Sequence, residues 1–113
     1  MIKIIWREDL NKVPISHQKN LSKQVIIKCG EIPGLLQFAR ATFDVSEVIE
    51  EHFHSDMVEI FYVIAEKVKI IYKDSVDIAA KGDSLIIYPD QSHSFKFIEK
   101  TELIYFNLAK SNI

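Results

Sequence analysis

The feature of this sequence that most constrains its fold is a succession of short apolar runs, each ended by a turn signal. Isoleucine, valine, phenylalanine and tyrosine dominate the runs, which favours strands over helices. The runs are "VIIKC" (25–29), "LLQFARATF" (35–43), "EVIEEHFH" (47–54), "EIFYVI" (59–64), "KVKIIY" (67–72), "VDIAA" (76–80), "SLIIY" (84–88), "HSFKFI" (93–98) and "ELIYFNL" (102–108). Closely spaced strands without helical periodicity predict an antiparallel sandwich or barrel, in which any helix is short.

The segment before these runs has a different character. The stretch "NKVPISHQKNLSKQ" (11–24) is polar and contains Pro14, which is typical of a loop or a wrapping arm. A chain of 113 residues fits one domain. We therefore expect residues 1–24 to form an N-terminal arm or edge strand that packs on the barrel, and residues 25–113 to form the barrel. We expect His17, within the arm, to be exposed and outside any site.

Composition and charge narrow the classes of partner. The chain is 48% hydrophobic and 27% charged, as in ordinary globular proteins, and its net charge of −2 gives no general attraction for nucleic acids or anionic membranes. Cys29 is the only cysteine, so no intramolecular disulfide can form. The N-terminal "MIKIIWRED" is too short and too charged for a secretory signal, and no segment resembles a membrane span. We expect a soluble cytoplasmic protein without nucleic-acid or membrane partners.

The strands themselves carry information about assembly. Alternation along "EIFYVI" (59–64) places apolar side chains on both faces of the strand, and an apolar face must be covered. In a small chain with few helices, the second cover is either another strand layer or another subunit. We therefore expect a homodimer.

Two histidines in "HFH" are the first candidates for a functional site. His52 and His54 are two residues apart, so they point to the same side of a strand, while Phe53 points away. Glu59 follows "SDMV", a plausible turn that would bring its carboxylate back beside the imidazoles. Imidazole and carboxylate ligands suit one divalent transition metal: Fe, Mn, Ni, Co, Cu or Zn.

A third histidine extends this group. His93 follows the turn "YPDQS" and has the strand parity of Phe95 and Phe97, whose rings we expect inside the barrel. A lone inward histidine is more often a hydrogen-bonded core residue than a metal ligand, and a His-x-His pair alone is weak evidence. The combination with an inward glutamate and a later inward histidine predicts a metal site. Its ligands would be His52, His54, Glu59 and His93.

The spacing of these ligands resembles the two motifs of the cupin superfamily, here of the small single-domain type. The first motif has Gly, five residues, His-x-His, three or four residues, Glu, six residues and Gly. In "SEVIEEHFHSDMVEIFYVIAE" (46–66) the ligand positions are kept, while Ser46 and Glu66 replace the two glycines. Such glycines often lie in turns with positive φ, so Glu66 predicts either a strained hairpin or a rebuilt one.

The second cupin motif is matched by "GDSLIIYPDQSHSFKF" (82–97). Gly82 and His93 are kept, whereas Tyr88, Asp90 and Phe97 replace a proline, a glycine and an asparagine. The resemblance implies an all-β double-stranded β-helix, or jelly-roll barrel, with little helix and often dimeric. It also implies one pocket and a metal held by three histidines and one glutamate, with positions open for substrate or water.

Further residues could line this pocket. Glu50 has the strand parity of His52 and could act as a general base at the rim, or it could be a solvated acid at a strand end. Phe61 and Phe95 would give the site an apolar setting, and the hydroxyl of Tyr88 could contact a ligand or lie at an interface.

A long strand offers two more polar side chains for the pocket. Gln37 and Arg40 are three residues apart, so at most one of them enters the barrel. An inward Arg40 would indicate an anionic substrate.

The fold does not name a reaction, because the cupin barrel hosts many chemistries. The first hypothesis is a metal-dependent enzyme for a small organic molecule, either a dioxygenase or an isomerase or lyase. The alternative is a non-catalytic module that binds or senses a small molecule. A third hypothesis is a vestigial barrel without metal, in which the histidines are ordinary pocket residues. Metal content separates the vestigial barrel from the other two hypotheses, and oxygen consumption separates a dioxygenase from the rest.

Overall fold

The structure is a computed structural model that describes residues 1–16 and 18–110. In these residues, one short 3-10 helix, η1 (Arg7–Asp9), precedes ten strands. The strands are β1 (Lys12–Ile15), β2 (Gln18–Ile27), β3 (Leu35–Phe43), β4 (Val48–His52), β5 (Met57–Ala65), β6 (Lys67–Tyr72), β7 (Ser75–Ala80), β8 (Ser84–Ile87), β9 (His93–Phe97) and β10 (Thr101–Ala109). The all-β prediction is confirmed, and each apolar run from residue 25 onward contributes a strand.

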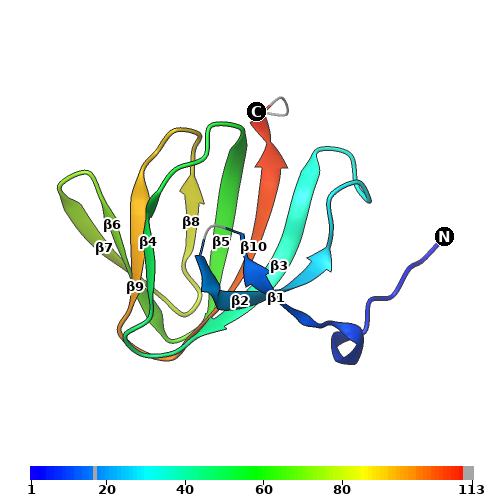
Figure 1. The fold of residues 1–113 in the computed structure, drawn as a ribbon, viewed down its shortest axis with the longest axis horizontal. Coiled ribbons are helices and arrows are strands. Elements are labelled where there is room, and N and C mark those ends of the chain that lie inside the picture. Colours follow the sequence, from blue (N-terminus) through cyan, green and yellow to red (C-terminus); the bar gives the residue numbers. More distant parts are fainter. Residues whose placement is uncertain (17, 111–113) are drawn as a thin grey trace.

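The strands form two antiparallel sheets that face each other. The larger sheet has the order β1-β2-β3-β10-β5-β8, and the smaller has the order β4-β9-β6-β7. Figure 1 shows the two sheets enclosing a common interior, with the β1–β2 hairpin in front of the space between them. This arrangement is the predicted jelly-roll barrel.

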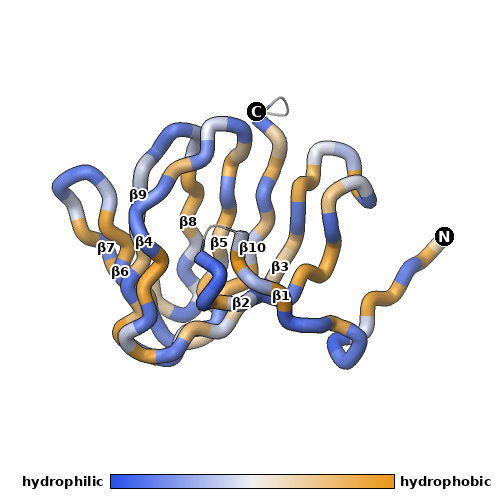
Figure 2. The backbone as a smooth tube through the Cα atoms, viewed as in Figure 1, coloured by the Kyte–Doolittle hydropathy of each residue, from blue (hydrophilic) through white to orange (hydrophobic). Residues whose placement is uncertain are grey.

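Alternating side chains fill the interior of this barrel. Along β10, every second residue from Thr101 to Asn107 is buried, which is the pattern of a strand with one face on a core. Figure 2 shows hydrophilic and hydrophobic residues alternating along several strands. Phe43 and Phe97 stack across the sheets with ring centroids 4.2 Å apart, so aromatic packing joins the two layers.

The polar N-terminal stretch is not a loop, contrary to one of the two sequence-based expectations for it. It forms β1 and most of β2, and its buried residues Ile15 and Leu21 belong to the core. Gln18 joins β2 to the edge strand of the smaller sheet: its amide donates to the carbonyl of Val48, and its Oε1 accepts from the backbone N–H of Glu50 at 2.8 Å. The suggested boundary at residue 24 falls inside β2, so the division into arm and barrel stays a prediction. His17 lies outside the described residues.

Three turns in which another residue replaces a glycine of the cupin motifs have a positive φ, as a glycine would allow. Ser46, Glu66 and Asp90 have φ values of 74°, 61° and 69°, and each replaces a glycine of the cupin motifs. The hairpin at Glu66 is therefore strained rather than rebuilt, because side chains with a Cβ disfavour this region. Asp90 is the easiest of the three to accommodate, since aspartate tolerates the left-handed conformation better than most residues.

The described residues include no helix that is both long and apolar enough to cross a membrane.

Candidate metal centre

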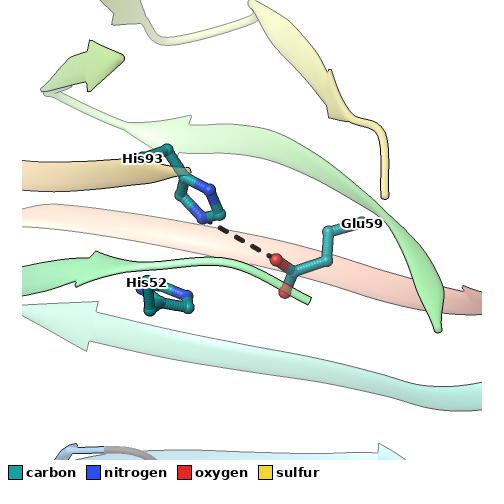
Figure 3. Close-up of side chains that lie close together, drawn as sticks. All are labelled: His52, Glu59 and His93. Carbon is teal, nitrogen blue, oxygen red and sulfur yellow. Dashed lines mark ion pairs between the residues drawn. The ribbon is translucent and has the colours of Figure 1, made fainter. Parts of the chain in front are cut away.

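Three side chains from the two sheets converge inside the barrel. His52 ends β4 and His93 begins β9, and the two residues are direct Cα partners in the smaller sheet. Glu59 comes from β5 in the larger sheet and points towards them (Figure 3). One ligand atom from each of these three described residues lies within 4.8 Å of the other two. The three residues therefore form a group that could hold a metal ion.

His54 lies beside this group, just beyond the end of β4. Its Nε2 is 3.8 Å from Oε1 of Glu59, and its ring centroid is 5.2 Å from that of His52. The structure thus brings together all four residues that the sequence predicted as ligands. Phe53, between the two histidines, is exposed, as expected for a side chain that points away.

The backbone holds two of the imidazoles in a defined orientation. Nδ1 of His52 is 2.8 Å from the carbonyl oxygen of Glu50, and Nδ1 of His93 is 2.9 Å from that of Gln91. A carbonyl oxygen can only accept, so each Nδ1 carries the proton and donates it. The Nε2 atoms are then left with lone pairs, which is the tautomer that a metal-binding imidazole requires.

The carboxyl group of Glu59 lies in surroundings that disfavour its negative charge. The residue is 6% exposed, and its Oε1 has no hydrogen-bond partner among the described residues. Burial raises the pKa of Glu59 to about 7, and the positive charge of Lys23 acts in the opposite direction. Burial is also the main cause that lowers the pKa of His93 and that of His54. Burial therefore favours the neutral forms of His54 and His93, beside an oxygen of Glu59 that has no donor among the described residues.

These features fit a divalent transition metal. Oε1 of Glu59 is 3.8 Å from Nε2 of both His54 and His93. Two ligands about 2.1 Å from one tetrahedral ion are about 3.4 Å apart, so the observed separations need little contraction. A metal would also compensate the buried oxygen, which is costly to leave without a partner.

A small apolar cavity adjoins the ligands. Its volume is about 30 Å³, counted as the space open to the centre of a water molecule, so it holds one or two waters. Phe61 and Phe95 line it, with their rings edge-to-face at 5.2 Å, as does Tyr105, which stacks on Phe61 at 5.1 Å. Burial, with a smaller effect from Glu59, raises the pKa of Tyr105, so its hydroxyl stays protonated.

The structure places two other candidates away from this cavity. Tyr88 is 60% exposed and is not one of the described residues that line the cavity. The pairing of β4 with β9 shifts register between Ile49 and His52, and Ile49 therefore takes the inward position that alternation assigned to Glu50. Glu50 is exposed.

The two polar residues of β3 take opposite faces, as their spacing predicts. Arg40 pairs with Glu102 across the outer face of the larger sheet. Gln37 faces the interior, where its Oε1 accepts a hydrogen bond of 2.9 Å from Nζ of Lys23. The inward cation is therefore Lys23, which sequence reasoning missed.

Asn107 is a second buried polar residue that sequence reasoning missed. The alternation of faces along a strand could have identified Lys23 and Asn107 as inward residues. Lys23 lies on the same face as Leu21, and Asn107 lies on the same face as Tyr105.

Comparison with known proteins agrees with this architecture. No family model matches the sequence, and no curated protein matches it significantly. Among solved structures, a predicted oxalate decarboxylase from Thermotoga maritima is 14% identical, with a TM-score of 0.83 over 95% of this chain and 99% of the other. An RmlC-like cupin from Shewanella frigidimarina is 18% identical, with a TM-score of 0.75 over 99% and 96%. The iron(II) form of HppE is 12% identical, with a TM-score of 0.75 over 95% of this chain and 60% of that one.

The chain therefore has the cupin fold, as the two motifs predicted. At these identities the similarity establishes the fold, and the site has to be judged from its own residues.

Proposed function

We propose that this protein is a metal-dependent enzyme that acts on a small organic molecule. One divalent transition metal would be held by His52, His54, Glu59 and His93. The observation that carries the proposal is the buried Oε1 of Glu59, which has no hydrogen-bond donor among the described residues and faces two imidazole nitrogens.

The residues around the site have separate tasks in this proposal. When bound, the metal would supply a Lewis acid for an oxygen atom of the substrate or a binding position for O₂. The carbonyls of Glu50 and Gln91 keep the imidazoles of His52 and His93 aligned. Phe61, Phe95 and the other apolar side chains of the cavity exclude bulk water, so electrostatic interactions inside are weakly screened. The side chain of Glu50 is exposed and is not among the described residues that line this cavity, so it has no part in the proposal.

Two reaction types fit this site. A dioxygenase would bring O₂ and an organic substrate together, and an isomerase or lyase would polarise a carbonyl or hydroxyl group. The iron(II) HppE structure and the predicted oxalate decarboxylase share the fold, and both types remain in the proposal. Oxygen consumption with a panel of enols, thiols and phenols separates them, because only the dioxygenase consumes O₂ in step with substrate.

Metal content tests the site directly. We expect protein made without a histidine tag to contain close to one equivalent of transition metal per chain by elemental analysis. The double variant His52→Ala/His93→Ala should contain far less, because two ligands are lost. Glu50→Gln, a change at an exposed acid on the same strand, is the matched control and should keep the metal. Equal metal in the wild type and the double variant would contradict the ligand assignment.

A non-catalytic binding or sensing module is the second candidate. A cavity of about 410 Å³ reaches His93 and has room for a small organic molecule, so such a module could bind its ligand there without any reaction. Tight metal binding without turnover of any panel compound would favour this candidate over the enzyme.

We also propose a homodimer formed through the outer face of the larger sheet. Tyr62 and Ile86 on neighbouring strands of this face are exposed by 41% and 52%. Light scattering should give twice the mass of one chain, and Tyr62→Lys/Ile86→Lys should give a monomer. Val76→Lys, a change at an exposed residue of β7, is the control. A wild-type monomer at micromolar concentration would contradict the proposal.

A reducing, cytoplasmic setting is the last part of the proposal. The single Cys29 is an exposed free thiol, which such a compartment keeps reduced. Fractionation of the source cells tests this location.

A further inference from the structure

A row of polar side chains crosses the inner face of the larger sheet beside the candidate metal ligands. Asn107 on β10 is the direct Cα partner of Gln37 on β3 and of Glu59 on β5. Lys23 on β2 continues the row through its hydrogen bond to Gln37. The row thus joins a cation to a metal-ligand candidate across four neighbouring strands.

Asn107, like Glu59, has a buried oxygen without a hydrogen-bond partner among the described residues. It is 5% exposed, and its Oδ1 has no hydrogen-bond partner among the described residues. Buried amide oxygens nearly always accept a hydrogen bond, so an unpaired one marks the place of a missing donor. A hydroxyl group of a ligand would be such a donor.

Lys23 supplies a positive charge inside the barrel. Its ammonium group has three donors, and the carboxamide oxygen of Gln37 accepts one of them at 2.9 Å. The residue is half-buried, and burial lowers the pKa of Lys23 while the negative charge of Glu59 raises it. An ammonium group in such a place is an effective partner for a carboxylate, because the surroundings screen the pair less than water does.

The charges of the site favour an anion. With a divalent metal, the interior would hold two positive charges from the metal and one from Lys23. Glu59 would contribute one negative charge, and the histidines would be neutral. The excess positive charge is more than Glu59 alone can compensate, so an anionic ligand would lower the electrostatic energy of the loaded site.

We propose that Lys23 and Asn107 form a ligand subsite that binds a small hydroxycarboxylate. The ammonium group of Lys23 would bind the carboxylate, and Oδ1 of Asn107 would accept from the hydroxyl group. Gln37 would be a positioning residue that holds the ammonium group. This inference rests on the proposed function, because it names the class of molecule that the metal site would take.

Glycolate is the simplest probe, with acetate lacking its hydroxyl and ethylene glycol lacking its carboxylate. Titration calorimetry and protein NMR would follow binding of all three to metal-free and metal-loaded protein. We expect glycolate to bind about tenfold or more tightly than either analogue, because hydrogen bonds to a charged group give roughly that factor. The side-chain amide signals of Asn107 should shift with glycolate and remain nearly unchanged with acetate.

Two matched variants isolate the charge of Lys23. Lys23→Gln should weaken glycolate binding by about tenfold or more and leave the affinity for ethylene glycol unchanged. Lys19→Gln removes an equal charge from an exposed position of the same strand and should leave glycolate binding unchanged. The metal content should be the same in all three proteins. If Lys23→Gln does not fold, the affinities of the wild type for glycolate, acetate and ethylene glycol still test the subsite.

The outcomes separate this inference from the proposed function. A wild type that binds no metal contradicts the proposed function, and glycolate binding to the metal-free protein then tests the subsite alone. A wild type that binds metal but holds glycolate no better than ethylene glycol overturns the subsite. Equal glycolate affinity in the wild type and Lys23→Gln also overturns it.

Discussion

At the scale of single residues, Glu59 shows how burial changes the chemistry of a carboxyl group. Its side chain faces imidazoles and apolar rings instead of water, and its pKa rises from 4.5 to about 7. In the folded protein without metal, the neutral acid is therefore favoured up to nearly neutral pH. A bound metal would favour the ionised form instead, so metal binding and protonation compete at this atom.

Because the pKa of Glu59 is raised, the free energy of unfolding of the metal-free protein should depend on pH. Between pH 4.5 and about 7 the folded metal-free protein keeps the proton on Glu59 and the unfolded chain loses it. The contribution of Glu59 to the free energy of unfolding should therefore fall by about 3 kcal/mol as the pH rises through this window. Urea unfolding with a chelator present, compared between the wild type and Glu59→Gln, measures it.

The comparison with Glu59→Gln is needed because the histidines act in the opposite direction. The lowered pKa values of His54 and His93 should make stability increase as the pH rises towards 6.5. That contribution is common to both proteins and cancels in their difference. A difference that stays constant from pH 4.5 to 7 would contradict the assignment of the shift to Glu59.

At the same scale, sequence reasoning placed the candidate metal ligands better than the residues around them. His52, His54 and Glu59 could be predicted because short-range strand alternation and one turn relate them. Glu50 was misplaced because the register shift before His52 breaks that alternation, and no residue of the strand signals such a shift. Lys23 was missed because the surrounding polar stretch masked an alternation that only Leu21 and Val25 reveal.

At the scale of elements, the turns keep conformations that their residues do not favour. Ser46, between β3 and β4, has a φ of 74°, and its N–H donates to the carbonyl of Phe97 at 2.8 Å. The hydrogen bond keeps the turn in place although a serine there is strained.

Replacement of this serine by glycine should stabilise the protein. We expect Ser46→Gly to raise the free energy of unfolding by about 0.5–1 kcal/mol, because relief of the strain exceeds the entropy that glycine adds to the unfolded chain. Ser55→Gly is the matched control: Ser55 is an exposed loop serine without positive φ, and its replacement should be neutral or destabilising. Denaturant unfolding of both variants measures the difference, and the opposite order would contradict this account.

Strand positions were the most predictable feature at this scale. The run at 35–43 coincides with β3 and the run at 67–72 with β6, because β-branched and aromatic residues continue to the last residue of each strand. The N-terminal hairpin was not predictable in this way. Its residues 12–24 hold few apolar side chains, and the pairing of β1 with β2 decides their conformation.

At the scale of the whole molecule, the barrel depends on contacts between its two sheets. Gln18 links the sheets on one side, where its carboxamide satisfies a carbonyl and an N–H of β4 as a neighbouring strand would. The N-terminal hairpin is thereby part of the barrel wall, and Ile15 from this hairpin reaches the cavity beside the metal ligands.

Loss of this link should destabilise the whole domain. We expect Gln18→Ala to lower the free energy of unfolding by about 1–2 kcal/mol, since two hydrogen bonds are lost. Gln24→Ala removes a single contact of 3.3 Å to the carbonyl of Leu10 and should cost less. Urea denaturation of both variants tests the ranking, and an equal or larger effect of Gln24→Ala would show that Gln18 does not join the sheets.

The hydrogen bonds at Nδ1 of His52 and His93 allow the sequence around the site to diverge during evolution. Both rings are oriented by peptide carbonyls two residues earlier, at Glu50 and Gln91, and every amino acid carries such a carbonyl. A scan that replaced Glu50 or Gln91 with other side chains would find little effect, although both positions hold the imidazoles in place. The surroundings of the site can thus diverge widely in sequence while its nitrogen atoms keep their direction.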